Sequence, residues 1–250
     1  MIAASYHPGH RGTDPLCLAE MLIMKSFCNT LRMVLFALLL SSSCVIAKEM
    51  NLLPKYGMQP KPEKVLEADR EFLSNMDQMF DGDRIKAANA VASRGWDFLR
   101  SGDSATAMRR FNQAWMLNPK NVQALWGMAA VVGAEGDVDA GLSLFREAET
   151  IDGSDIDLRV DSTRAMSIAA VRKSDTVLMK EALSRFEQIS IQAPTHPMNW
   201  QNWAVALFYT GDYAGAWEKI AKMEKLIIPS MIDRRFIDAL TTKMPRPGTE

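Results

Sequence analysis

The sequence predicts an all-α protein, a solenoid of about four helical hairpins with a capping helix at each end, and two observations carry that prediction. The first is a repeat: a pattern of Gly, Ala or Gly, Phe and Ala recurs after 34 residues, at Gly102, Ala107, Phe111 and Ala114 and again at Gly136, Gly141, Phe145 and Ala148. A 34-residue period is typical of stacked helix–turn–helix units. The second is composition, because 48% hydrophobic and 24% charged residues are ordinary for a soluble protein with a sizeable core.

Residues 1–47 are typical of a signal peptide. Lys25 and Arg32 flank the start of an apolar run, 33–40, which is too short to cross a bilayer but long enough for a signal-peptide core. Small or modest side chains before position 48 predict cleavage after Ala47. Residues 1–23 carry no pattern of their own, so translation can also start at Met24.

A second interpretation of the same segment is a lipoprotein signal. The stretch 40–44 ends in Cys44, whose acylation would tether the protein to a membrane, although Ser41 stands where such signals favour a larger apolar residue. All three cysteines, Cys17, Cys28 and Cys44, lie in or beside the leader. A chain cleaved after Ala47 therefore has no thiol and relies on packing for its stability.

Residues 48–61 are expected to form an extended, mobile linker, since Pro54, Gly57 and Pro60 prevent a continuous helix. Residues 62–82 are expected to form an N-terminal capping helix. Pro62 suits its first turn, and its apolar residues share one face, at Val65, Leu66, Phe72, Leu73, Met76 and Phe80.

Residues 83–230 are expected to form the array of hairpins. Small residues such as Ala107 let two helices approach closely, and a large one such as Phe111 fills the space beside them. Glycines in the turns can adopt a positive φ, and the aspartate after each can cap the next helix, at Gly102–Asp103, Gly136–Asp137 and Gly211–Asp212.

Counted from Ala88, these units resemble the tetratricopeptide repeat. The first unit places Gly95, Gly102, Ala107, Phe111 and Pro119 where that family has its signature residues. The units are expected at 88–121, 122–155, 163–196 and 197–230. The third follows a seven-residue shift in phase and has Val177 where the turn glycine is expected, so its first half departs from the pattern.

The remaining C-terminal residues are assigned to a second capping helix and a tail. Residues 231–242 place Phe236, Ile237 and Leu240 on one apolar face, and Pro245 and Pro247 predict a disordered tail over 243–250.

Neither catalysis nor nucleic-acid binding is expected. The formal net charge is −1, which provides no electrostatic footprint for nucleic acid. Only His196 remains beyond the leader, at a repeat junction where it is expected to cap a helix, so a His/Cys metal cluster cannot form. The acidic stretch 152–161 is interpreted as a solvated insertion, with Asp155 as a helix N-cap. We therefore expect no enzyme activity, no cofactor and no metal.

The resemblance implies a binding groove on the inner wall of the superhelix. Carried over to this sequence, the wall positions are Asn89, Trp96, Arg100, Gln123, Trp126, Arg164, Gln201, Phe208 and Tyr209. Aromatic and arginine side chains are the usual makings of a binding hot spot. The alternative for Trp96 and Trp126 is that they pack between helices. The carboxylate clamp of some family members is missing, because Ala92, Trp96 and Gly127 stand at its positions.

The resemblance thus implies a protein–protein interaction module, an adaptor or scaffold of the bacterial cell envelope that binds a protein or peptide segment in its groove. Export to the periplasm is expected from the leader, with membrane attachment only if Cys44 is acylated. The first alternative is a lipid-anchored factor that assists outer-membrane or pilus assembly. A remote alternative is an enzyme.

Overall fold

The computed structural model describes residues 50–226 and 233–248. The chain divides into two units, Met1–Met50 and Asn51–Glu250, and the helical array belongs to the second. The predicted signal peptide, its Cys44, the last residues of the fourth predicted unit and Met231 and Ile232 of the second cap lie outside the described residues.

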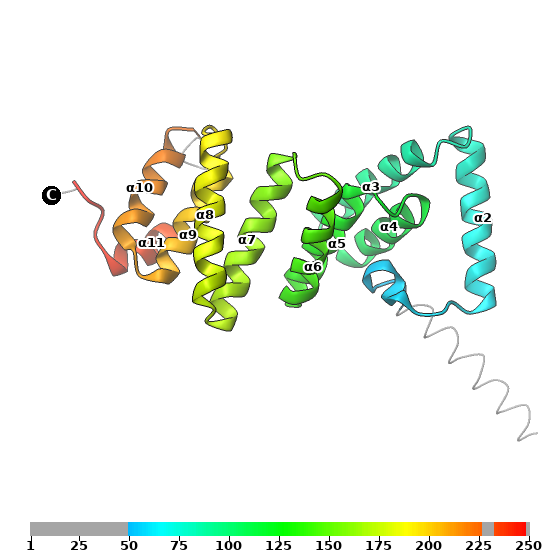
Figure 1. Cartoon of the computed structure of the whole chain (residues 1–250), viewed down its shortest axis with the longest axis horizontal. Coiled ribbons are helices and arrows are strands. Elements are labelled where there is room, and N and C mark those ends of the chain that lie inside the picture. The colour runs from blue at the N-terminus through cyan, green and yellow to red at the C-terminus, as the bar shows by residue number, and fades with distance from the viewer. Residues whose placement is uncertain (1–49, 227–232, 249–250) are drawn as a thin grey trace, which may run out of the picture. The chain divides into compact units, whose positions relative to one another are not determined.

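The described part of the second unit is all-α (Figure 1). A short 3₁₀ segment precedes ten α-helices: η1 Pro54–Met58, α2 Glu63–Met79, α3 Arg84–Arg100, α4 Ser104–Leu117, α5 Val122–Glu135, α6 Val138–Ile151, α7 Ile156–Lys173, α8 Thr176–Gln192, α9 Pro197–Thr210, α10 Tyr213–Glu224 and α11 Arg234–Lys243.

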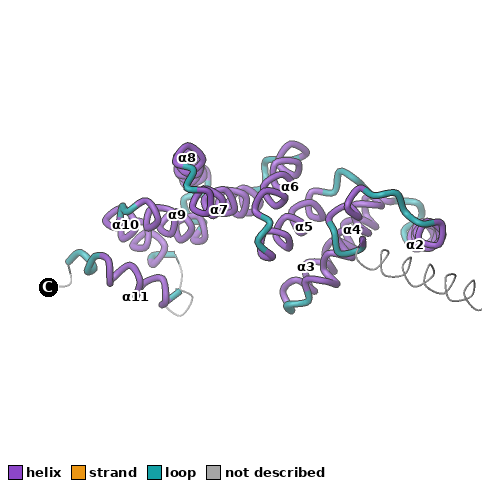
Figure 2. Tube along the Cα trace, turned by 90° about the horizontal axis from the view of Figure 1, so that it is seen from below, coloured by secondary structure: helices purple, strands orange, loops and turns teal. Residues whose placement is uncertain are grey.

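The helices pair in chain order into four hairpins, α3/α4, α5/α6, α7/α8 and α9/α10, and each hairpin packs on the next. In Figure 2, α6 and α8 lie on one side of the row and α3 on the other. One cluster of buried side chains runs from α3 through α6 into α7, and a second joins α9, α10 and α11. Phe111, Phe145 and Phe186 are buried at corresponding places in three hairpins. The predicted fold class is confirmed.

The turns follow the predicted chemistry. Gly136 and Gly211 end their helices with φ of 104° and 84°. Asp103, Asp137 and Asp212 each accept a hydrogen bond from a backbone amide three residues further on, at 2.8–3.0 Å. Asp155 and His196 cap α7 and α9 in the same way.

The third hairpin corrects the predicted unit 163–196. Helix α7 begins at Ile156, so residues 156–162, the seven that separate the predicted second and third units, are helical and not a solvated insertion. Helices α7 and α8 have 18 and 17 residues, whereas α5 and α6 have 14 each, so the extra residues lengthen both helices. The turn lies at Ser174, in a left-handed conformation with φ of 53°, and not at Val177.

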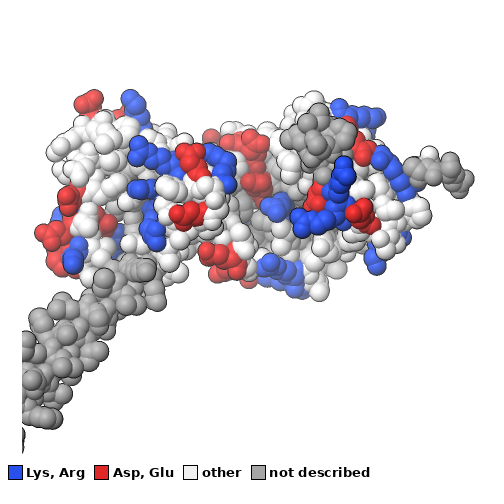
Figure 3. All heavy atoms as spheres, turned by 180° about the vertical axis from the view of Figure 1, so that it is seen from behind, with Lys and Arg blue, Asp and Glu red and all other residues white. Residues whose placement is uncertain are grey.

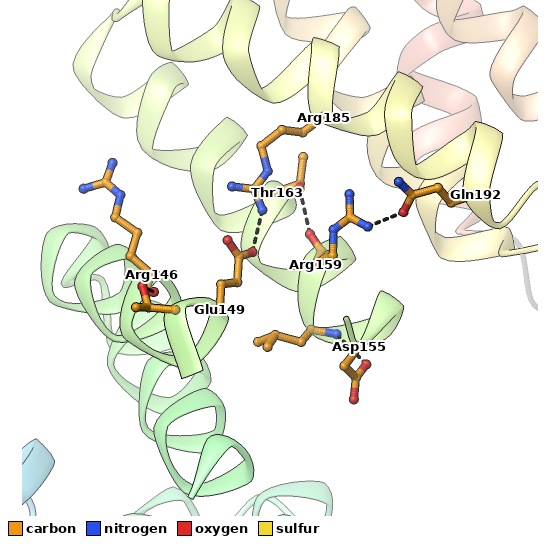
Figure 4. Close-up of polar contacts among 9 residues, drawn as sticks. Arg146, Glu149, Asp155, Arg159, Thr163, Arg185 and Gln192 are labelled. Carbon is orange, nitrogen blue, oxygen red and sulfur yellow. Dashed lines mark hydrogen bonds and ion pairs between the residues drawn. The ribbon is translucent and has the colours of Figure 1, made fainter. Parts of the chain in front are cut away.

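Polar contacts hold this longer hairpin together, and one joins it to its neighbour (Figure 4). Arg185 of α8 pairs with Glu149 of α6, and Arg159 of α7 binds the side chain of Gln192 near the end of α8. The hydroxyl of Thr163 donates to the Arg159 carbonyl at 2.7 Å.

The segment predicted as an extended linker over 48–61 is ordered against the array from Asn51 onward. Asn112 of α4, which is fully buried, donates hydrogen bonds to the carbonyls of Asn51 and Leu53 at 3.0 and 2.8 Å. Tyr56 is buried, and Lys55 pairs with Glu147 of α6. The prediction of a mobile linker was therefore wrong for this part, because contacts with α4 and α6 hold the proline-rich segment in place.

The C-terminal segment predicted as a disordered tail over 243–250 is likewise packed as far as it is described. Lys243 belongs to α11. The Met244 carbonyl accepts from the Trp217 indole at 3.0 Å, and Arg246 pairs with Glu224. These contacts fix the chain after α11 against α10.

Candidate binding surface

Five residues predicted from the first two units lie together in one hollow between α3 and α5. Its volume is about 430 Å³, and it is lined by Asn89, Ser93, Trp96, Arg100, Gln123 and Trp126. Of these, only Ser93 is absent from the predicted wall. Because α3 and α5 are the first helices of consecutive hairpins, the same positions of both helices face the same space.

Two tryptophans form the floor of this first hollow. The rings of Trp96 and Trp126 meet edge to face with centroids 5.1 Å apart, and Trp96 meets buried Phe111 in the same way at 5.5 Å. Both tryptophans are half-buried, so each packs between helices and also lines the hollow. Ring contacts of this kind fix the aromatic surface in advance of any binding.

The polar side chains of the first hollow are anchored to the scaffold. The Asn89 side-chain oxygen accepts from the amide of Asn121 at 2.7 Å, and Asn121 is the N-cap of α5. The exposed Arg100 guanidinium binds Asp97 at 2.6 Å. Asn89 therefore joins the first two hairpins, and its own NH₂ group has no partner among the described residues.

A second hollow lies beside α5, between it and α6 and α7. It has a volume of about 150 Å³ and an apolar wall of small residues that includes Ala130, Gly133, Ala134 and Ala165. Asp161 and the predicted wall residue Arg164 also line it. The two hollows are connected through one hydrogen bond, from the Trp126 indole nitrogen to Asp161 Oδ2 at 3.0 Å.

Asp161 is the functional candidate that sequence reasoning missed, since it was placed in a solvated insertion. Burial raises the pKa of its carboxyl group, and this outweighs the lowering by the Trp126 hydrogen bond and by Arg164. Counting 3.6 residues per turn from the N-cap Asp155 would have put Asp161, Ala165 and Ile168 on one face. The phase shift before the third unit concealed that pattern.

The predicted wall residues of the fourth hairpin lie on α9, where one of them packs among other aromatic rings. Phe208 of α9 is half-buried among Tyr209, Tyr213 and Phe236, with ring centroids 5.5–5.7 Å apart. Phe236 of α11 packs on it, so Phe208 belongs to the aromatic cluster that joins α9, α10 and α11. Tyr209 is exposed and Gln201 is half-buried.

The predicted role of His196 as a cap is confirmed. Its Nδ1 accepts from the Asn199 amide at 3.2 Å, so Nε2 carries the proton and donates to Asp157 at 2.7 Å. Within 50–226 and 233–248, no three His, Cys, Asp or Glu side chains are grouped as metal ligands, and no helix combines the length and apolarity of a membrane span.

Acidic and basic side chains are interspersed on the face seen in Figure 3. A face of mixed charge gives no extended field of one sign to attract a polyanion. The charge pattern of this face therefore does not point to nucleic acid as a ligand.

No protein-family model matches the chain, and neither does any curated protein sequence. Solved structures do match. PilF of Pseudomonas aeruginosa is similar over 64% of this chain and 67% of its own, with 18% identity and a TM-score of 0.50. MamA of Desulfovibrio magneticus RS-1, from residue 41 to its end, is similar over 65% and 84%, with 16% identity and a TM-score of 0.50. At these identities the likeness shows the fold, which is that of tetratricopeptide-repeat proteins.

Proposed function

We propose that this protein is a non-catalytic binding module that captures a segment of a partner protein along the hollows of α3, α5 and α7. One observation carries the proposal: residues chosen only by repeat position, Asn89, Trp96, Arg100, Gln123 and Trp126, line a single hollow. Fixed aromatic surface beside polar groups is the composition of a protein-binding hot spot.

The partner segment is bound by apolar and hydrogen-bonding contacts. The Trp96–Trp126 floor covers an apolar side chain, and the NH₂ of Asn89, which has no partner among the described residues, can donate to a backbone carbonyl of the segment. Arg100 is exposed at the rim and orients the segment through its charge.

The predicted leader supports a location of this activity in the cell envelope. In this proposal the chain is exported, cleaved after Ala47 and released into the periplasm. The alternative is acylation of Cys44, which makes the protein a tethered lipoprotein that assists an outer-membrane or pilus assembly. Intact mass of the protein from its native envelope separates the two, because one form begins at Lys48 and the other at a lipid-modified Cys44.

Binding is tested by comparing pull-downs from the same envelope. Arg100→Glu reverses a charge at the rim of the first hollow, and Trp126→Ala removes half of its floor. Arg146→Glu is the matched control, because Arg146 is exposed on α6 and lines neither hollow. The partner should be lost from both hollow variants and kept by the control, with far-UV circular dichroism unchanged. A partner kept by all three folded variants would refute the groove.

A further inference from the structure

The second hollow has the dimensions of one side chain. Its volume is about 150 Å³, which in another protein is enough to hold a benzene ring. Most of its wall is apolar: small residues such as Ala130, Gly133 and Ala165 line it together with the larger Val138, Phe145 and Ile168. A Cβ built on Gly133 would meet no atom within 4 Å, so the space beside α5 is open.

The polar end of this hollow is the carboxylate of Asp161, which can accept more hydrogen bonds than it does. Asp161 Oδ2 accepts from the Trp126 indole, whereas Oδ1 accepts no hydrogen bond from the described residues. Asp161 is half-buried and lines the hollow, so a ligand there can approach its carboxylate. A carboxylate has about four acceptor sites, and most of those on Asp161 have no donor among the described residues.

The charged groups around Asp161 do not neutralise it by contact. Arg164 and Asp157 come from its own helix and His196 from the start of α9, while its contact with α5 is the neutral indole of Trp126. No ion pair within 4.0 Å joins Asp161 to a basic side chain among the described residues, and His196 pairs with Asp157 instead. Burial raises the pKa of the Asp161 carboxyl, as expected for a carboxylate that has lost water and gained too few donors.

We propose that the hollow between α5 and α7 receives one lysine side chain of the captured segment, with its ammonium group on Asp161. This inference rests on the proposed function and specifies its partner. The aliphatic stem covers Ala130, Gly133 and Ile168, and the ammonium supplies the donors that Asp161 lacks. Lysine combines a thin apolar stem with a compact charge, whereas the planar guanidinium of arginine is broader.

The preference of the hollow for a lysine side chain is tested by comparing the affinities of two small probes. One is n-butylammonium, which has the stem and the ammonium group of lysine, and the other is neutral n-butanol. The reporter is the indole N–H signal of Trp126 in a ¹⁵N-correlation spectrum of the protein at neutral pH, assigned by its loss in Trp126→Phe. A hydrogen bond to a charged group predicts that n-butylammonium binds about tenfold more tightly than n-butanol.

Three variants distinguish charge from shape. Asp161→Asn keeps an acceptor for Trp126 and should abolish the preference for the cation, whereas Asp139→Asn, at an exposed site on α6, should leave it intact. Gly133→Leu fills the hollow and should abolish the binding of both n-butylammonium and n-butanol. If that variant fails to fold, Ala134→Leu closes the hollow from its exposed rim.

Equal binding of the two probes, or a preference for n-butylammonium that survives Asp161→Asn, would overturn the lysine site. Tighter binding of n-butanol would assign the hollow to an apolar side chain. The groove itself is tested separately by selecting random displayed peptides on the wild-type protein. Selected peptides without an enriched lysine contradict the lysine site alone, whereas no selected peptide at all contradicts the proposed function.

Discussion

The phenyl ring of Phe111 occupies the space that a side chain at Gly127 would need. A Cβ atom built on Gly127 would stand 2.2 Å from Cζ of Phe111. A Cβ on Gly95 would stand 2.6 Å from Cε1 of the same ring. Phe111 is fully buried, so helices α3 and α5 approach α4 closely only because glycine stands at both contacts.

We expect Gly127→Ala to lower the free energy of unfolding by roughly 1–3 kcal/mol, because the new methyl group overpacks the core. Urea unfolding measures the change. Combining it with Phe111→Leu should recover part of the loss, since the smaller side chain makes room.

The control for this substitution lies on the same helix. Gly133→Ala should stabilise the protein by about 0.5–1 kcal/mol, because alanine is the better helix former and its methyl group meets no atom. Equal effects of the two substitutions would show that the close contact with Phe111 does not govern stability.

Ser174→Gly should stabilise the protein by about 1 kcal/mol. Ser174 ends α7 with φ of 53°, a conformation that L-residues adopt at a cost and that glycine adopts freely. The reverse change at the corresponding turn, Gly211→Ser, should cost a similar amount, since φ there is 84°. Both are measured by urea unfolding, and a destabilising Ser174→Gly would contradict the strain assigned to this turn.

Asn112→Leu should release the segment that precedes α2. The buried amide of Asn112 holds the carbonyls of Asn51 and Leu53, and a leucine leaves both without a donor. Trypsin should then cleave after Lys55 faster than in the wild type. Asn199→Leu is the control, because Asn199 is equally buried but bonds to Phe186 at the other end of the array. Unchanged cleavage in Asn112→Leu would mean that other contacts hold the segment.

The raised pKa of Asp161 gives its contribution to stability a definite sign. Between the ordinary carboxyl pKa and the raised value, the folded protein keeps a proton that the unfolded chain has lost. The free energy of unfolding therefore falls as the pH rises through this window. Asp161→Asn removes that dependence, so the stability of the variant relative to wild type should increase from about pH 4 to about pH 7. Urea unfolding at both pH values measures it, and a constant difference would contradict burial as the cause.

The fold could be predicted from the sequence because its signals are local. A turn glycine, the aspartate that caps the next helix and a phenylalanine nine residues after that glycine recur with one period in the first two units. The third unit was predicted in the wrong register. An unfavourable Ser174 takes the place of the glycine there, so a signal based on residue preference did not mark the turn.

Only part of the candidate site was predicted, because the repeat register was correct in the first two units and wrong in the third. Asn89, Trp96 and Arg100 were found because their unit is in phase, and so were Gln123 and Trp126. Asp161 was missed because the register before it was wrong. The contact between Phe208 and Phe236 was not predicted, because nothing in α9 shows that α11 packs on its ring.

For the first, second and fourth units the sequence by itself determined the hairpins, their turns and the side of each helix that faces the core, because backbone preference and helical periodicity act within a few residues. Only the tertiary structure decided that Trp126 meets Asp161, that the small side chains beside α5 leave a hollow, and that the segment from Asn51 is held by Asn112. Those features depend on how closely helices far apart in the sequence approach one another, and that distance is set by the combined packing of many side chains.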